Sequence, residues 1–155
     1  MTLAERITPN NITIEDAKFV YSTNFAGKEG PYNREGERSF NVAIPENLIE
    51  PLQADGWNIK FTKGTDEYPE EPYLPVEVGF KYRPPEIVLI QEGKKTFISE
   101  PMAGILDSTE FESFDIVIRP YMYDVNGNKG VKAYLKTFYG NVPSDPIQAK
   151  YRDLD

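Results

Sequence analysis

Residues 114–140, FDIVIRPYMYDVNGNKGVKAYLKTFYG, predict the element around which the chain is organised, a hairpin of two long β-strands. Asn126-Gly127 separates two runs of alternating residues, and this dipeptide is among the strongest short-range signals for a tight hairpin turn. Side chains alternate between the two faces of a strand, so the pattern assigns each residue to one side. In the first strand one face carries Phe114, Ile116 and Ile118, and the other carries Arg119, Tyr121 and Tyr123.

The second strand of the hairpin divides in the same way. Its mostly apolar face carries Val131, Ala133, Leu135, Thr137 and Tyr139, and its mixed face carries Lys132, Tyr134, Lys136 and Phe138. A bulge at Arg119-Pro120 would move Tyr121 and Tyr123 to the opposite side, so the assignment depends on the register.

The mixed face combines the two kinds of side chain that hold a single strand of nucleic acid. Cations neutralise phosphates, and flat rings stack on bases with little dependence on base identity. Tyr and Phe are also strong strand formers, so packing of these rings under a loop or a helix is the alternative. The candidates for stacking are Tyr121, Tyr123, Tyr134 and Phe138, and the candidates for phosphate contacts are Arg119, Lys132 and Lys136.

The length of 155 residues suits one domain, and many short segments between 13 Pro and 11 Gly indicate an all-β fold with one or two short helices. A helix is expected from Pro45 to Asp55, ending at Gly56, and a helical turn at 101–106. Trp57 is expected in the core, with a stacking role as the alternative. Strands are expected, besides the hairpin, at 12–23, 38–44, 57–63, 73–80, 86–91 and 94–98.

The domain organisation predicted from these segments has three parts. Residues 1–11 form a flexible N-terminal arm, 12–140 the folded domain and 141–155 a loosely packed C-terminal tail. No apolar run approaches the roughly 20 residues of a membrane-spanning helix. The first residues, MTLAERITPNN, lack the apolar region of a secretory signal, so a soluble protein of the cytoplasm is expected.

The absence of both His and Cys removes the commonest general base and the thiolate metal ligands. A non-enzymatic protein without a cofactor is therefore expected, although Asp, Glu, Lys and Tyr can also catalyse. Four carboxylates at 64–72 invite comparison with a metal site, but their spacing fits no calcium-binding loop, so a solvated acidic loop is preferred.

The formal net charge of −8 argues against a generic nucleic-acid binder, which is usually basic. The acids are segregated, however. Residues 64–77 carry five acids and no base, and 107–115 carry four acids and no base, whereas 126–140 carry three Lys and no acid. A local positive face is therefore compatible with an acidic chain.

Three segments together resemble single-stranded DNA-binding proteins of bacteriophages. They are FVYSTNFAGKEGPYNREGERSFNVAIPE, then ADGWNIKF, then GILDSTEFESFDIVIRPYMYDVNGNKGVKAYLKTFY, in order over most of residues 15–140. The resemblance implies an oligonucleotide/oligosaccharide-binding (OB) barrel, here with additional strands at 73–98. It also implies sequence-tolerant binding of single-stranded DNA in phage replication or recombination, with replication or recombination proteins as further partners. A homo-oligomer is left open.

The resemblance adds a loop to the candidate site. Residues 24–38 would correspond to a clamp between the first two barrel strands, closing over DNA that lies on the hairpin. An ordinary solvated loop is the alternative for this Gly-rich and Asn-rich stretch. The candidate contacts in the loop are Lys28, Tyr32, Arg34 and Arg38.

Two other classes of function remain open from the sequence. A structural or protein-interaction module, such as a virion protein or an adaptor, explains the acidity and the many strands, but not the lysines that alternate with rings. An enzyme that uses Mg²⁺ held by Asp and Glu would need converging carboxylates, and the acids here cluster in loops.

Overall fold

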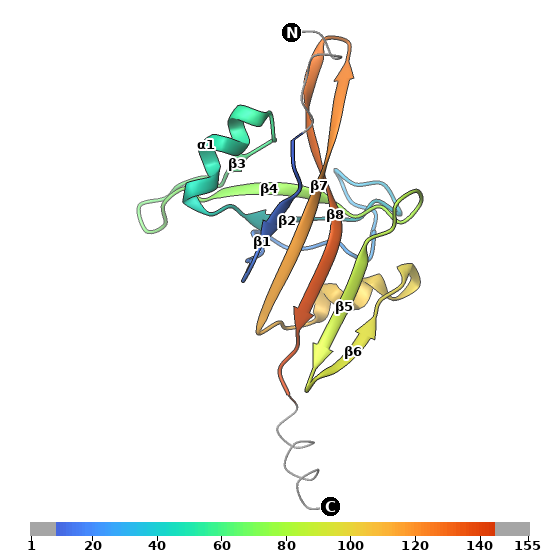
Figure 1. Ribbon diagram of the computed structural model, residues 1–155. Coiled ribbons are helices and arrows are strands. Elements are labelled where there is room, and N and C mark those ends of the chain that lie inside the picture. The colour runs from blue at the N-terminus through green and yellow to red at the C-terminus, as the bar shows by residue number, and fades with distance from the viewer. Residues whose placement is uncertain (1–8, 145–155) are drawn as a thin grey trace, which may run out of the picture.

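The two longest elements of the protein form one antiparallel hairpin (Figure 1). A computed structural model describes residues 9–144, and in it β7 (Ser113–Val125) pairs with β8 (Asn128–Asn141). Asn126 and Gly127 connect them with φ angles of 52° and 82°. Two successive positive φ angles match the tight hairpin turn that Asn-Gly favours, so the predicted hairpin and its turn are confirmed.

The strands close into a barrel around this hairpin. The strand order is β1-β7-β8-β4-β2, with β1 (Ile12–Ile14), β2 (Ser39–Ala43) and β4 (Pro72–Glu77), and β4 runs parallel to β8. After β1 the chain crosses to β2, where the Ala43 N–H donates to the Lys18 carbonyl and the Val20 N–H to the Asn41 carbonyl. The segment after β1 thus joins both edges of the sheet, and the predicted all-β, OB-like barrel is confirmed.

Aromatic rings fill the interior of the barrel. Phe25, Phe40 and Phe138 are fully buried, and the Phe25 and Phe40 rings stack with centroids 5.1 Å apart. Phe114 stacks on Phe138, also at 5.1 Å. Trp57 is 4% exposed and packs in the same cluster. It is therefore a core residue, which was the role expected from the sequence, with stacking as the alternative.

The two helical segments lie where they were expected. Helix α1 (Glu46–Asp55) ends at Gly56, whose φ of 95° turns the chain so that the Gly56 N–H donates to the Gln53 carbonyl and the Trp57 N–H to the Leu52 carbonyl. A 3₁₀ segment, η2 (Glu100–Ser108), extends the helical turn predicted at 101–106. No helix in residues 9–144 has the length and apolar composition needed to cross a membrane.

Two predicted strands are shorter than expected. The first, predicted at 12–23, is regular over three residues and then bends, because Asp16 and Tyr21 adopt positive φ angles of 50° and 61°. The stretch predicted at 57–63 contains only the two-residue β3 (Lys60–Phe61), which pairs with β4. Before it, Trp57 leaves the strand path and bridges to Val131 of β8.

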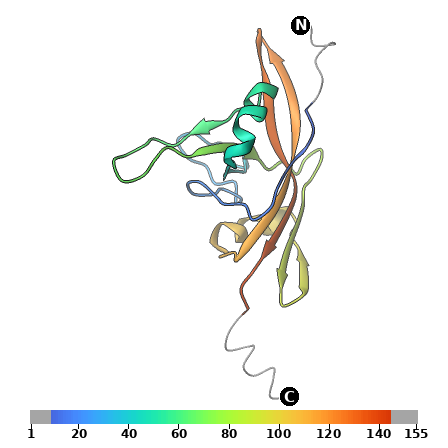
Figure 2. The same ribbon diagram turned by 60° about the vertical axis from the view of Figure 1, so that its left-hand side comes forward.

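An additional hairpin branches from the barrel, as predicted from 86–98. β5 (Glu86–Gln91) pairs with β6 (Lys94–Phe97) and runs parallel to the end of β8. Strand β8 contacts β4 at Tyr134 and β5 from Thr137 onward. The sheet therefore branches between these two residues, as the divergence of β4 and β5 from β8 shows in Figures 1 and 2.

A β-bulge lies at this branch and corrects one prediction. Val117 pairs with Thr137 while Ile118 pairs with Leu135, which leaves Lys136 as the extra residue of β8. Past the bulge the faces of β8 exchange. Phe138 is therefore fully buried instead of lying on the mixed face, and its assignment as a stacking residue was wrong.

The ends of the predicted domain lie close to the limits of the described residues. Strand β8 ends at Asn141, and the Val142 N–H donates to the Ile90 carbonyl. Most of the predicted N-terminal arm (1–8) and of the predicted tail (145–155) lies outside the described residues, so the conformations proposed for both stay predictions.

Candidate nucleic-acid interface

The mixed face of the hairpin is assembled by cross-strand pairing. Arg119 lies opposite Tyr134, Tyr121 opposite Lys132, and Tyr123 opposite Gly130. The intervening residues Ile118, Ala133 and Leu135 are buried in the core. Because the register is regular over these residues, five of the predicted contacts share one outward face of the barrel, as the alternation predicted. They are Arg119, Tyr121, Tyr123, Lys132 and Tyr134.

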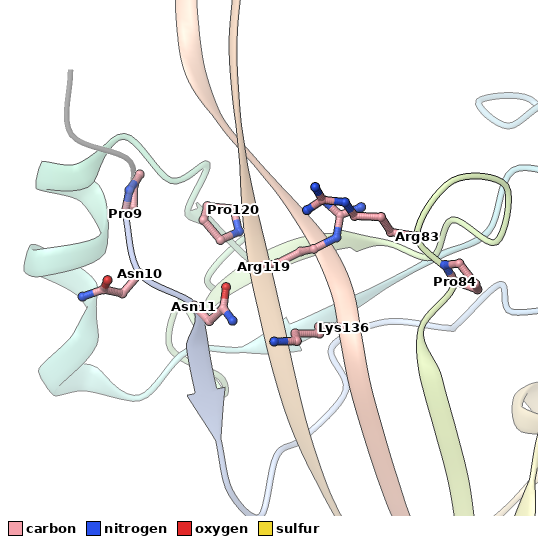
Figure 3. A pocket seen from close by; sticks show the side chains of 8 residues that line it. All are labelled: Pro9, Asn10, Asn11, Arg83, Pro84, Arg119, Pro120 and Lys136. Atoms are coloured by element: carbon pink, nitrogen blue, oxygen red, sulfur yellow. The ribbon is translucent and has the colours of Figure 1, made fainter. Parts of the chain in front are cut away.

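The side chain of Lys136 points into a basic hollow beside this face. The bulge turns Lys136 outward, where its side chain points toward Asn11, while Arg119 of β7 and Arg83 of the loop between β4 and β5 extend toward each other (Figure 3). All of these residues line the hollow. Asn10 and Asn11, just before β1, line the other side of the hairpin. The hollow has a volume of about 620 Å³ and no carboxylate in its lining. Three cations and the Asn11 amide in the lining of one hollow can hold an anionic group such as a phosphate.

A second hollow of about 470 Å³ continues from the first, since both are lined by Arg83, Arg119 and Pro120. The second hollow adds a cation and exposed rings: Tyr82 is 85% exposed and Tyr121 is 53% exposed. We call the two hollows together the cation–aromatic groove. Its lining consists of residues 9–11, 79, 81–84, 119–121, 134 and 136.

Three consecutive cationic and aromatic residues of the groove were not predicted from the sequence. Lys81, Tyr82 and Arg83 lie in the loop that leads from β4 to β5, just before two prolines. In the sequence these prolines indicate only an interruption of regular structure. The alternation of cation, ring and cation at 81–83 was the available signal. The branching of the sheet brings this loop beside Arg119 and Lys136, and that proximity is not encoded locally.

Glu77 organises the centre of the mixed face. The Lys132 Nζ lies 3.3 Å from the Glu77 carboxylate, and Tyr134 lies opposite Glu77 in the pairing of β4 with β8. Burial alone would lower the pKa of Lys132, but the charge and hydrogen bond of Glu77 raise it above its ordinary value. Burial and then Glu77 raise the pKa of Tyr134. Both groups therefore keep their protons at neutral pH.

The loop at 24–38 is ordered by its own side chains. The Asn24 side chain bonds both the N–H and the carbonyl of Lys28, and the Asn33 amide donates to three carbonyls of the loop. Tyr32 is fully exposed, and Lys28 and Arg34 are also exposed. Tyr32 and Arg34 line a hollow that shares no lining residue with the groove and is also lined by three glutamates, and Lys28 is not among its lining residues. The structure therefore does not bring the predicted clamp and the groove into one cavity.

Arg38, at the exit of the loop, is engaged within the protein. Its guanidinium stacks on Phe80 at 5.5 Å, lies 3.6 Å from the Glu100 carboxylate and donates to the Gly36 carbonyl. The side chain is only 18% exposed. These contacts assign Arg38 to joining the loop to the barrel.

Tyr123 is also partly engaged. Its ring covers the backbone of Gly130, and a Cβ at that glycine would overlap the ring. Tyr123 and Lys132 line a smaller hollow of about 150 Å³ next to Glu77. This end of the mixed face is therefore narrower and less positive than the groove. No cluster of acidic side chains in residues 9–144 is arranged to hold a metal ion.

The strand-dominated, barrel-like sheet places the protein in the class of OB-type folds. Basic and aromatic residues lie on its surface. The chain belongs to a family of phage proteins, because the model of the family described as "Putative phage ssDNA-binding domain" matches residues 1–155. No curated protein matches the sequence.

Solved structures similar to this chain come from bacteriophage Enc34. The single-stranded DNA-binding protein of that phage, in complex with ssDNA, is 13% identical, with 88% of this chain and 89% of that chain covered and a TM-score of 0.56. A C-terminal truncation of the same protein is 14% identical, with 88% of each chain covered and a TM-score of 0.54. At these identities the likeness concerns the fold.

Proposed function

We propose that the protein binds single-stranded DNA along the cation–aromatic groove, with little dependence on sequence, and supports phage DNA replication or recombination. The observation that carries the proposal is that four cations and two exposed rings line one groove, with no carboxylate among the lining residues. Membership of the phage family supports the same conclusion.

In this mechanism the two parts of the groove have different roles. Arg83, Arg119 and Lys136 neutralise phosphates in the basic hollow, releasing counterions as they do so. Tyr82 and Tyr121 offer ring surface for bases, and each engaged ring contributes about 1–3 kcal/mol. Because every base has a flat face, such contacts tolerate any sequence.

The acidic part of the surface is held away from this groove. The loop between β3 and β4, which carries Asp66, Glu67 and Glu70, projects away from the β7–β8 hairpin (Figure 2). Segregation of this kind leaves the groove attractive to a phosphate backbone although the chain is acidic overall. The exposed Lys28, Tyr32 and Arg34 of the separate loop stay candidates for a second region of contact.

The test is fluorescence anisotropy of a labelled oligo-dT, measured from about 50 mM to about 200 mM salt. Binding that weakens with salt, and that excess unlabelled duplex does not displace, is the expected result. Replacing Arg83, Arg119 and Lys136 together by Gln should reduce the slope of log K against log salt by about 2, at about 0.7 per lost phosphate contact.

The matched control replaces three exposed lysines outside the groove, Lys60, Lys94 and Lys95, by Gln. This variant has the same net charge as the groove variant and should keep the wild-type slope. Absence of binding by the wild-type protein at low salt would contradict the function. An equal decrease of the salt slope in the two variants would contradict the placement of the DNA site in the groove.

The stacking residues are tested separately. Tyr82→Ala and Tyr121→Ala should each weaken binding without changing the salt slope, because stacking releases few counterions. Tyr68→Ala is the control, since Tyr68 is 70% exposed but lies in the acidic loop. An effect of Tyr68→Ala equal to the other two would show that loss of any exposed ring lowers affinity.

A further inference from the structure

We infer that Tyr134 is a positioning residue for Arg119 and does not itself stack on a base. The inference deepens the proposed function and rests on it, because Arg119 is taken as a phosphate contact. It changes the role of Tyr134, whose place on the mixed face suggests a stacking ring like Tyr121.

The surroundings of Tyr134 differ from those of the exposed rings. The Arg119 guanidinium carbon lies 4.7 Å from the centre of the Tyr134 ring, within the range of a cation–π contact. The Tyr121 ring meets it edge-on at 5.9 Å, and Gly79 lies against the ring edge. Tyr134 is half-buried, whereas Tyr82 and Tyr121 are exposed. The ring is thus already in contact with neighbours before any ligand arrives.

The polar end of the ring lies on the side of Glu77. Glu77 lies opposite Tyr134 in the pairing of β4 with β8, and after burial it is the main cause of the raised pKa of Tyr134. A chain of contacts therefore runs from β4 through the ring to the guanidinium on β7. Its members are Glu77, Tyr134 and Arg119.

Arg119 occupies the junction of the groove. It lines both hollows, the basic one with Lys136 and the aromatic one with Tyr82. A long side chain loses rotamer freedom when it binds a phosphate, and a ring that holds it in advance reduces that loss. Stacking on a ring also leaves the N–H groups at the rim of the guanidinium free for phosphate oxygens.

The test is a double-mutant cycle in oligo-dT binding with Tyr134→Leu and Arg119→Met, each measured across a range of salt. If Tyr134 acts through Arg119, Tyr134→Leu should raise Kd about three- to tenfold and reduce the salt slope toward that of Arg119→Met. The double variant should bind no more weakly than Arg119→Met. Tyr134→Phe retains the ring and should keep most of the wild-type slope.

A base stacked on Tyr134 gives a different pattern. Tyr134→Leu would then weaken binding at an unchanged salt slope, and its effect would add to that of Arg119→Met, which overturns the inference. If the wild-type protein does not bind, the proposed function fails, and the inference fails with it. If the wild type binds but the effects add, only the inference fails.

A measurement on the wild-type protein covers the case in which Tyr134→Leu does not fold. In the NMR spectrum of the free protein, the Arg119 Nε–H should be shifted upfield by the Tyr134 ring current. The shift should persist when oligo-dT is added, because the ring remains under the guanidinium. Loss of the upfield shift on binding would mean that a base has displaced Arg119, which overturns the inference.

Discussion

Glu77, the last residue of β4, lies opposite Tyr134 of β8, and its carboxylate lies 3.3 Å from the Lys132 ammonium group. The same carboxylate is, after burial, the main cause of the raised pKa of Tyr134. Glu77 thus acts on two neighbours on the mixed face, and it neutralises a cation that would otherwise be available to a phosphate.

Glu77→Gln should separate these two effects. The amide oxygen of Gln can still accept from Tyr134, but the charge that pairs with Lys132 is lost. The pair is half-exposed and worth less than about 1 kcal/mol, so oligo-dT affinity should rise roughly two- to fivefold at low salt, with a steeper salt slope. Anisotropy titrations measure both quantities.

The matched control for that variant is Glu86→Gln. Glu86 also accepts a hydrogen bond from a tyrosine, Tyr139, but it lies past the bulge and has no lysine partner at salt-bridge distance in the described part of the chain. The affinity of Glu86→Gln for oligo-dT should equal that of the wild type. Weaker binding by Glu77→Gln would mean that the charge of Glu77 is needed to hold Tyr134.

The pairing of Lys132 with Glu77 should appear in the alkaline range of protein stability. The pKa of Lys132 is raised in the folded protein, so its contribution is complete below the ordinary value of 10.5 and is lost as pH rises through the higher folded value. The difference in urea midpoint between wild type and Lys132→Met should be constant from pH 8 to about 10 and shrink above that. A difference that grew with pH would contradict the assignment.

Gly140 should not tolerate a side chain. A Cβ at this position of β8 would lie 2.6 Å from the Phe111 ring and 2.9 Å from the Phe138 ring, and Phe138 is fully buried. Gly140→Ala should therefore cost about 1–3 kcal/mol in urea unfolding, as overpacking of cores does. Gly30→Ala is the control, because a Cβ there has no neighbour within 4 Å among residues 9–144.

Trp57 should matter for stability and not for DNA. It is 4% exposed, and its indole N–H has no hydrogen-bond partner in the described residues, so Trp57→Phe removes no hydrogen bond. That variant should lose less than about 1.5 kcal/mol, whereas Trp57→Ala should lose about 3–5 kcal/mol. Circular dichroism in urea measures both, and oligo-dT affinity of Trp57→Phe should be unchanged. Tenfold weaker binding would place the indole in the interface.

The parts of the fold set by local chemistry were predictable from the sequence. Asn126-Gly127 predicted the turn, and alternation assigned Ile118 and Leu135 to the core and Arg119 and Tyr134 to the surface. Phe138 was misassigned because the bulge before it arises where β5 replaces β4 as the neighbour of β8. Such a change of neighbour is a tertiary event without a local sequence signal.

The candidate site was predicted less completely for the same reason. Lys81, Tyr82 and Arg83 become part of the groove only because the chain leaves the barrel between β4 and β5 at that point. Arg38 looked available as one cation among several in a polar loop. Its contacts with Phe80 and Glu100 depend on segments far away in the sequence.

The basic hollow is built from residues before β1, from the loop after β4 and from the β7–β8 hairpin, and these segments are far apart along the chain. An unfolded chain has no such hollow, so under the proposed function DNA is a ligand of the folded state alone. At a free DNA concentration about 100 times Kd, this preference adds about 2.7 kcal/mol to the free energy of unfolding. The protein would thus be most resistant to heat and proteolysis while coating a strand, and its lifetime would be coupled to the amount of single-stranded DNA present.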